Sequence, residues 1–316
     1  MSALQPIEVA PATDVPPLRK RVKRYVRFLL VRSALAIVSS LPLRFAAWLG
    51  RGFGLIAFRV ARGERRKALE SLTRAFPEWT PEQREATARA MFRHLGQAAF
   101  EVGCIRQIDP RMDELVEWSA EDRAVLDRAL ARNKGVVFVT GHVGNWELLA
   151  RRVALAGYPA QSIAKETTDP RTTALIEKFR REGKVGSIWR GQGGAAKHML
   201  RALKAGEILG LLIDQDTKVQ SVFVPFFGHR ASTPRAAADL ALRTDAAVIM
   251  GFCHRIAEGT KYRLSLKRLE PLPSSGDRER DAIELTARMT AEIERAIRER
   301  PEQWVWMHRR WKTQSP

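Results

Sequence analysis

The sequence predicts an α/β fold in which helices flank a mainly parallel sheet, preceded by an N-terminal helical segment that associates with a membrane. Three observations support this fold. Short apolar runs of strand length alternate with helical stretches from residue 136 to residue 300. Residues 64–132 have a helical pattern almost throughout. Finally, the apolar N-terminal region is interrupted by arginines, as in helices that lie at a membrane surface.

The net charge and the cysteine content limit the classes of protein to which this chain can belong and the partners that it can bind. The 316 residues include 54 Lys and Arg against 35 Asp and Glu, a formal net charge of +19. Residues 1–67 alone hold 14 Lys and Arg but 3 Asp and Glu. This excess attracts nucleic acid, an anionic membrane or an acidic protein. Cys104 and Cys253 match no disulfide or metal spacing, which excludes a disulfide-stapled secreted module and indicates a reducing compartment.

The N-terminal region divides into a tail and a basic amphipathic segment. Several prolines and little apolar content predict disorder over residues 1–17. Residues 18–63 are rich in apolar side chains, but the longest run without a charge, Ser33 to Leu43, has 11 residues. A spanning helix needs about 20 apolar residues, so a clean transmembrane span is not supported.

An arginine stripe runs along this segment. On a helical wheel, Arg44, Arg51 and Arg62 fall within about 20° of one another. The remaining face carries Trp48 and other aromatic and aliphatic side chains, a composition typical of a helix in the membrane interface. The alternative is an ordinary surface helix that packs its apolar side on the core, for which the three glycines between residues 50 and 54 are suited.

The rest of the chain supplies the sheet and its covering helices. Helical sequence breaks at residues 76–81, where Thr80 can cap a helix that begins at Pro81. Strands are predicted at Val136–Val139, Ile208–Ile213, Val222–Phe226, Ala247–Phe252 and Tyr262–Leu269. Helices are predicted at Glu147–Ala156, Ala174–Glu182, Ala195–Ala205, Pro234–Arg243 and Arg278–Arg300, the last one stopped by Pro301.

The segment from the strand at residue 136 into the next helix carries the strongest chemical signal. Gly141 and Gly144 allow a tight turn after the strand. His142 then stands at the carboxyl edge of the sheet, and Glu147 in the first helical turn can reach one ring nitrogen. A carboxylate in that place fixes the imidazole tautomer, so that the other nitrogen can accept a proton from a hydroxyl nucleophile. The alternative is a structural histidine at the start of a helix.

Four blocks of sequence resemble one family, the lipid A biosynthesis acyltransferases, which transfer lauroyl or myristoyl chains late in lipid A biosynthesis. The first is Gly-His-Val-Gly-Asn-Trp-Glu at residues 141–147, which is similar to the family's His-x4-acid motif. The others are residues 66–77, residues 214–228, which begin Asp-Gln-Asp, and residues 301–312, which contain three tryptophans. Together they span roughly residues 60–312 in the family's order.

The resemblance assigns roles to five residues. It implies that His142 is the general base and Glu147 its acidic partner. It further implies that Asn145, Arg180 and Asp214 are substrate-binding residues, with Arg181 an open alternative to its neighbour. Without the resemblance, the sequence would favour a solvated charge on a helix for Arg180 and a cap of the following turn for Asp214.

The implied reaction moves a fatty acyl chain from an acyl carrier protein thioester to a hydroxyl group of a lipid A precursor. Residues 64–316 would form the acyltransferase domain and would need no metal or redox cofactor. The expected partners are acyl carrier protein, an anionic lipid and the cytoplasmic face of the inner membrane, with no nucleic acid. The alternatives are an acyltransferase for another glycolipid or a lysophospholipid and, more distantly, a basic nucleic-acid-binding protein, for which no motif is present.

Overall fold

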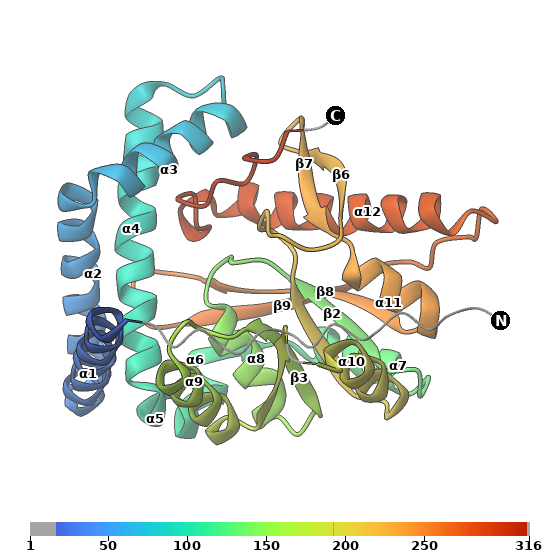
Figure 1. Ribbon diagram of the computed structural model, residues 1–316, viewed down its shortest axis with the longest axis horizontal. Coiled ribbons are helices and arrows are strands. Elements are labelled where there is room, and N and C mark those ends of the chain that lie inside the picture. The colour runs from blue at the N-terminus through green and yellow to red at the C-terminus, as the bar shows by residue number, and fades with distance from the viewer. Residues whose placement is uncertain (1–16, 192, 315–316) are drawn as a thin grey trace.

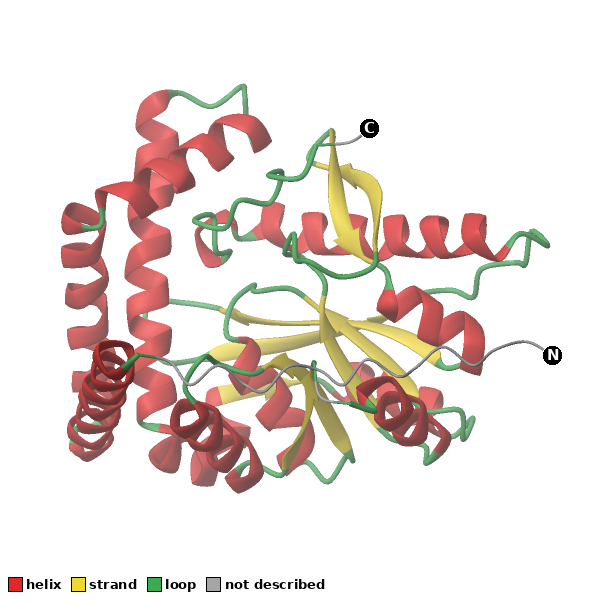
Figure 2. Ribbon diagram, in the orientation of Figure 1, coloured by secondary structure: helices red, strands yellow, loops and turns green. Residues whose placement is uncertain are grey.

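The structure, a computed structural model, describes residues 17–191 and 193–314. The tail predicted at residues 1–17 lies outside this range except for its last residue. A mixed sheet forms the centre of the molecule (Figure 2). Its strands are β1 (Val116–Trp118), β2 (Val136–Thr140), β3 (Ala160–Lys165), β4 (Val185–Arg190), β5 (Ile208–Leu212), β8 (Ala247–Arg255) and β9 (Tyr262–Arg268).

The sheet has the order β1-β9-β8-β2-β5-β3-β4 and is mainly parallel, as predicted. Only the β8–β9 pair is antiparallel among these neighbours. In the central register, Phe138 of β2 pairs with Gly210 of β5 and with Ile249 of β8. β2 therefore lies in the middle of the sheet, and every residue of this strand is buried.

Helices cover both faces of the sheet (Figure 1). They are α7 (Ala120–Leu130), α8 (Trp146–Leu155), α9 (Pro170–Glu182), α10 (Ala195–Lys204), α11 (Ala236–Thr244) and α12 (Arg278–Glu299). Because side chains alternate along a strand, Val137 and Val139 of β2 enter a core shared with α11 and α12. Val136 and Phe138 enter a second core on the opposite face, shared with α7 and α8.

The prediction missed four strands. β1 and β4 lie at the two edges of the sheet, and β3 is only half-buried, so their sequences lack a clear apolar pattern. The fourth strand, β7 (His229–Pro234), pairs with β6 (Ser221–Phe226) in a separate antiparallel hairpin. The strand predicted at 222–226 is therefore present, but it does not belong to the main sheet.

The N-terminal third of the described chain is helical. It comprises α1 (Leu18–Ser40), α2 (Leu43–Val60), α3 (Arg62–Ala75), α4 (Pro81–Gly103), α5 (Ile105–Ile108), the short 3-10 helix η1 (Asp109–Arg111) and α6 (Met112–Leu115). Thr80 caps α4 as predicted, since its side chain accepts the Gln83 N–H and the Gln83 side chain accepts the Thr80 N–H.

The structure corrects the arginine stripe. α2 ends at Val60 and a new helix begins at Arg62, so Arg62 does not continue the face of Arg44 and Arg51. No helix in the range 17–191 or 193–314 combines the length and the apolar character that a membrane crossing needs. The association of residues 18–63 with a membrane stays a prediction.

α2 has two different apolar faces. One packs on α4, where a Cβ at Gly54 would lie 2.1 Å from the Phe92 carbonyl oxygen and a Cβ at Gly96 would lie 2.3 Å from the Gly50 carbonyl oxygen. This close approach confirms the packing role expected for Gly50 and Gly54, whereas Gly52 is exposed and makes no such contact. The other face leaves Trp48 and several more large apolar side chains exposed.

Candidate active site

The loop between β2 and α8 carries the candidate general base. Gly144 has a φ of +63°, and a Cβ there would lie 2.0 Å from the Cys253 carbonyl oxygen on β8, so the turn requires glycine. The Gly144 N–H donates to the Gln303 carbonyl at 2.8 Å, and the Asn145 N–H donates to the Cys253 carbonyl at 2.9 Å. The predicted tight turn is confirmed, and it holds His142 at the carboxyl end of β2.

The His142 ring contacts an aspartate, where a glutamate was expected. Its Nδ1 lies 2.9 Å from Asp214 Oδ1, and the His142 backbone N–H donates to Asp214 Oδ2 at 2.7 Å. Trp304 Nε1 donates to the same Oδ2 at 2.8 Å. Asp214 follows β5, and the parallel β2–β5 pairing brings the ends of both strands to one edge. The expected contact of Glu147 with the ring is wrong, because Asp214 occupies the ring's Nδ1 side.

This contact shifts the two pKa values in opposite directions. Burial lowers the pKa of His142, but the charge and hydrogen bond of Asp214 and the charge of Glu147 outweigh burial and raise it above its ordinary value. Burial raises the pKa of Asp214, but the His142 charge and the hydrogen bonds from His142 and Trp304 hold it well below its ordinary value. The ionised aspartate fixes the Nδ1–H tautomer and leaves Nε2 without a hydrogen-bond partner among the described residues.

Asp214 was expected to bind substrate, and the structure places it differently. Its exposed fraction is 2%, and both carboxylate oxygens accept hydrogen bonds from the protein. The side chain therefore acts on His142 and presents no free surface to a ligand.

Glu147 instead forms an ion pair with Arg180. Arg180 Nη2 donates to Glu147 Oε1 at 2.7 Å, and Nε lies 3.4 Å from Oε2. The pair joins the first turn of α8 to the last turn of α9. Arg180 Nη1 is buried and has no hydrogen-bond partner in the described chain, so this guanidinium keeps donors for a ligand. Arg181 is exposed and does not line the cavity described below, so only Arg180 of the two neighbouring arginines lies beside Glu147.

An apolar cavity of about 590 Å³ lies beside this ion pair. Glu147 and Arg180 form part of its wall. Most of the remaining wall is apolar and comes from α1, α4, α5 and α9, including Leu35, Val102, Ile105, Leu175 and Phe179. Its volume lies in the range of small-molecule sites, and a few charged groups in an apolar wall are typical of such sites.

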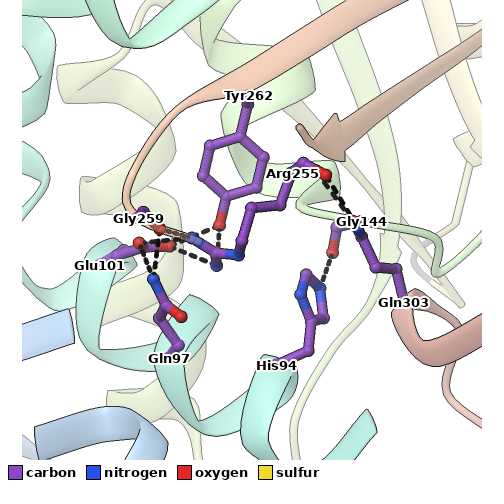
Figure 3. A network of polar contacts seen from close by, with 8 residues as sticks. All are labelled: His94, Gln97, Glu101, Gly144, Arg255, Gly259, Tyr262 and Gln303. Carbon is purple, nitrogen blue, oxygen red and sulfur yellow. Dashed lines mark hydrogen bonds and ion pairs between the residues drawn. The ribbon is translucent and has the colours of Figure 1, made fainter. Parts of the chain in front are cut away.

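A buried polar network supports the loop from the side of α4 (Figure 3). Arg255 of β8 forms a two-pronged ion pair with Glu101 of α4, with nitrogen–oxygen distances of 2.7 and 2.8 Å. The Tyr262 hydroxyl contacts both side chains, and Gln97 Nε2 donates to Glu101 Oε1 at 2.9 Å. The network therefore ties α4 to β8 and β9.

Two members of this group reach the loop itself (Figure 3). His94 Nε2 lies 3.2 Å from the Gly144 carbonyl oxygen, and burial lowers the pKa of His94 to about 3, so the neutral ring donates this hydrogen bond. The Gln303 side chain accepts the Arg255 N–H at 2.8 Å and donates to the Arg255 carbonyl at 2.9 Å. The Gly144 peptide is thus held at both its N–H and its C=O.

Asn145 has a structural contact. Its Oδ1 accepts the Leu148 N–H at 3.1 Å and caps α8, and the side chain is buried. The substrate contact expected for Asn145 stays a prediction.

Sequence reasoning missed three residues of the site: Trp304, Gln303 and His94. Gln303 ends the short 3-10 helix η2 (Pro301–Gln303) and Trp304 follows it, both within the C-terminal block, so their block was recognised but their contacts were not. The C-terminal tryptophans Trp304, Trp306 and Trp311 are all buried, with exposed fractions of 1%, 0% and 7%. These tryptophans pack on the core of the described structure.

Comparison with known proteins identifies the family of this chain. Residues 18–313 match the family described as bacterial lipid A biosynthesis acyltransferase. The chain belongs to this family. The resemblance inferred from the four blocks is therefore confirmed, and the protein is an acyltransferase of lipid A biosynthesis.

Individual relatives are similar in sequence to this protein over most of its length. The lipid A biosynthesis palmitoleoyltransferase of Escherichia coli is 30% identical over 281 residues, which cover 86% of this chain and 87% of that relative. The lipid A biosynthesis lauroyltransferase of the same organism is 26% identical and covers 88% of each chain. A lipid A biosynthesis acyltransferase of Haemophilus influenzae is 28% identical, with 86% of this chain and 83% of the relative covered.

Proposed function

We propose that this acyltransferase moves a fatty acyl chain from an acyl carrier protein thioester to a hydroxyl group of a lipid A precursor, with His142 as general base. The contact of His142 Nδ1 with Asp214 carries the proposal. It leaves Nε2 to accept a proton at the carboxyl edge of the sheet, where open α/β folds place their sites. The reaction so proposed uses no metal or redox cofactor.

In this mechanism Nε2 of His142 removes the proton of the acceptor hydroxyl. The oxygen attacks the thioester carbonyl carbon, the new carbon–oxygen bond forms, and the carbon–sulfur bond breaks. The departing thiolate takes the proton from His142, so the base returns neutral. Asp214 stabilises the imidazolium between these steps, as its effect on the pKa of His142 indicates.

Glu147 and Arg180 have a different part in this proposal. Glu147 orients Arg180 through the 2.7 Å ion pair, and the unpartnered Nη1 of Arg180 supplies a donor to the thioester carbonyl or to a phosphate. The charge of Glu147 also favours protonated His142. The apolar cavity beside this pair suits a fatty acyl chain, because its wall offers aliphatic and aromatic contacts.

We also place the protein at the cytoplasmic face of the inner membrane. The basic helix α1 and the exposed Phe45, Trp48, Phe53 and Ile56 of α2 support this location, because cationic and aromatic side chains together favour an anionic interface. Flotation of the purified protein with vesicles that contain anionic lipid tests the membrane association that this location requires, and protein that stays at the bottom of the gradient contradicts it.

The test of the reaction is the variant His142→Ala. Loss of the base should lower the transfer rate by a factor of about 10² to 10⁴, measured as acyl transfer from acyl carrier protein to a lipid A precursor. His198→Ala is the matched control, since His198 is exposed on α10. Normal turnover by a folded His142→Ala protein would refute the assigned base. Mass spectrometry of membrane lipids from cells with and without the protein identifies the acceptor and the transferred chain.

A further inference from the structure

The surface around α3 contains a concave region in which positive charge dominates. A hollow of about 870 Å³ lies between α3 and His229 of the β6–β7 hairpin. A second hollow of about 330 Å³ adjoins it along the C-terminal segment 309–312 and shares Glu70 and Arg74 with it. We call both together the α3 groove. Its accessible cations are Arg62, Arg65, Arg66, Arg74, Arg309 and Lys312, and Glu70 is its one acidic side chain.

The positive charge of the α3 groove is largely unneutralised. The side chains of Arg62 and Arg309 form no hydrogen bond or ion pair within the described part of the chain. Arg66 has only Glu70, at 3.7 Å, and both of these side chains are mostly exposed, so the attraction between them is weak. Lys312 donates to the Asp216 carbonyl at 2.7 Å and also lies 3.9 Å from the Asp216 carboxylate, so this cation alone is partly neutralised by a buried anion. The groove therefore attracts an anionic partner.

Two of the arginines are also held in place before any partner arrives. The Arg65 guanidinium lies 5.3 Å from the Phe58 ring centre, and that of Arg74 lies 5.6 Å from the Trp311 ring centre. The Arg74 carbonyl lies 3.3 Å from His229 Nε2. Ordered cations lose less conformational entropy when they bind, which favours a specific docking surface over a diffuse charge.

The α3 groove is connected to the catalytic centre. Lys312 and Thr313 bind Asp216, and Asp216 follows Asp214 by two residues. Trp304, five residues before the segment 309–312, donates to Asp214. A partner docked in the groove thus lies against a segment that binds Asp216 and is continuous in sequence with Trp304, which binds the carboxylate partner of His142.

The shape and chemistry of the groove favour a protein over a membrane. A bilayer is bound by exposed apolar side chains, which α2 presents as Phe45, Trp48, Phe53 and Ile56. No residue that lines the α3 groove is among the exposed large apolar side chains of the described chain. A concave cationic surface instead fits a convex acidic element, such as a helix about 10–12 Å wide.

We propose that the α3 groove docks the acidic carrier protein that delivers the acyl thioester, an inference that rests on the proposed function. The docked carrier would present its thioester to His142, while α2 holds the enzyme on the membrane. The arginines act on encounter and orientation of the donor and take no part in bond formation.

The test compares two thioester donors in one charge-reversal variant. Arg62→Glu/Arg66→Glu should raise KM for acyl carrier protein at least tenfold and flatten its dependence on salt. KM for an acyl-pantetheine thioester, which lacks the acidic protein, should change less than twofold. Both sites are exposed, and an acidic side chain suits position 62 in the first turn of α3. Glutamate at position 66 repels Glu70 by only a few tenths of a kcal/mol at an exposed site, so the fold should persist. Arg309→Glu serves as a second variant on the other wall.

The matched control is Arg201→Glu/Lys204→Glu, which makes the same charge change on exposed positions of α10 outside the groove. Its KM for both donors should stay within twofold of the parent. Unchanged KM for acyl carrier protein in the groove variants would overturn the docking site. If KM for acyl-pantetheine rises by the same factor, the docking site is also overturned, because the arginines then act on the acceptor. If the variants lose only vesicle binding, it is overturned because the arginines then act on the membrane. If the parent protein uses neither thioester, the proposed function itself fails.

Discussion

Two glutamate–arginine pairs in this enzyme have the same chemistry but different surroundings. Glu101 and Arg255 join α4 to β8 with side chains that are 0% and 8% exposed. Glu147 and Arg180 join α8 to α9 with side chains that are 22% and 14% exposed. Both pairs have nitrogen–oxygen distances of 2.7 Å at their closest. Distance alone therefore does not separate a structural pair from a functional one.

The difference lies in what remains free after the pair has formed. Both terminal nitrogens of Arg255 are bound, to Glu101, to the Gly259 carbonyl and to Tyr262, and only its inner Nε lacks a partner among the described residues (Figure 3). Arg180 keeps Nη1 without a partner in the described structure and lies in the wall of the apolar cavity. The first pair is committed to the scaffold, and the second retains capacity for a ligand.

The largest expected effect is on stability, in Arg255→Met. Removal of the cation leaves Glu101 charged in the interior, which should lower the free energy of unfolding by about 3–5 kcal/mol. Urea unfolding measures this value. Arg263→Met is the control, because Arg263 forms an exposed 3.1 Å pair with Glu117 and should change stability by less than about 1 kcal/mol. Equal effects of the two substitutions would remove the distinction between scaffold and surface pairs.

The second effect is on activity, in Arg180→Met. Loss of the free donor should lower kcat about 100-fold, as loss of one preorganised donor to a developing charge does. Stability should fall less than in Arg255→Met, because Glu147 is 22% exposed and water can solvate the carboxylate that is left, whereas Glu101 is 0% exposed. Arg181→Met, one residue along and exposed, should keep the parent's activity. A loss of stability as large as in Arg255→Met would show that this pair too belongs to the scaffold.

The smallest expected effect is the contribution of His94, which lies beside the Arg255 network, to the pH dependence of the free energy of unfolding. The folded protein keeps His94 neutral, since burial, with a smaller contribution from the Arg255 charge, lowers the pKa of His94 to about 3 from an ordinary value of 6.5. The unfolded chain therefore binds more protons between these values, and stability falls as pH decreases below 6.5. The slope reaches about 1.4 kcal/mol per pH unit.

The variant His94→Gln isolates this contribution. Glutamine can donate to the Gly144 carbonyl but does not titrate, so unfolding of the variant should depend less on pH between 6.5 and 5 than unfolding of the parent. His254, whose pKa burial lowers to about 4, remains in both proteins and cancels in the comparison. Parallel curves for parent and variant would show that His94 binds protons equally in the folded and the unfolded protein, which contradicts its burial as a neutral ring.

The motifs recognised in the sequence consist of residues that are close together in the chain, so they predicted local structure and no contact between distant residues. The helix start at Thr80 was predicted because a capping box is formed by residues three apart. The turn at Gly144 was predicted because a strand, two glycines and a helix follow one another. The break between α2 and α3 was missed, since a helical wheel assumes one continuous axis and Ala61 interrupts it.

The sequence by itself determined the family, the strand–turn–helix that carries His142, and the concentration of positive charge near the N-terminus. These properties are encoded by residues that are close together in the chain. Only the tertiary structure decided that Asp214 contacts the His142 ring and that Glu147 binds Arg180. Those contacts join residues 72 and 33 positions apart. Their geometry depends on which strands are neighbours in the sheet and how α9 packs beside α8, which no local pattern specifies.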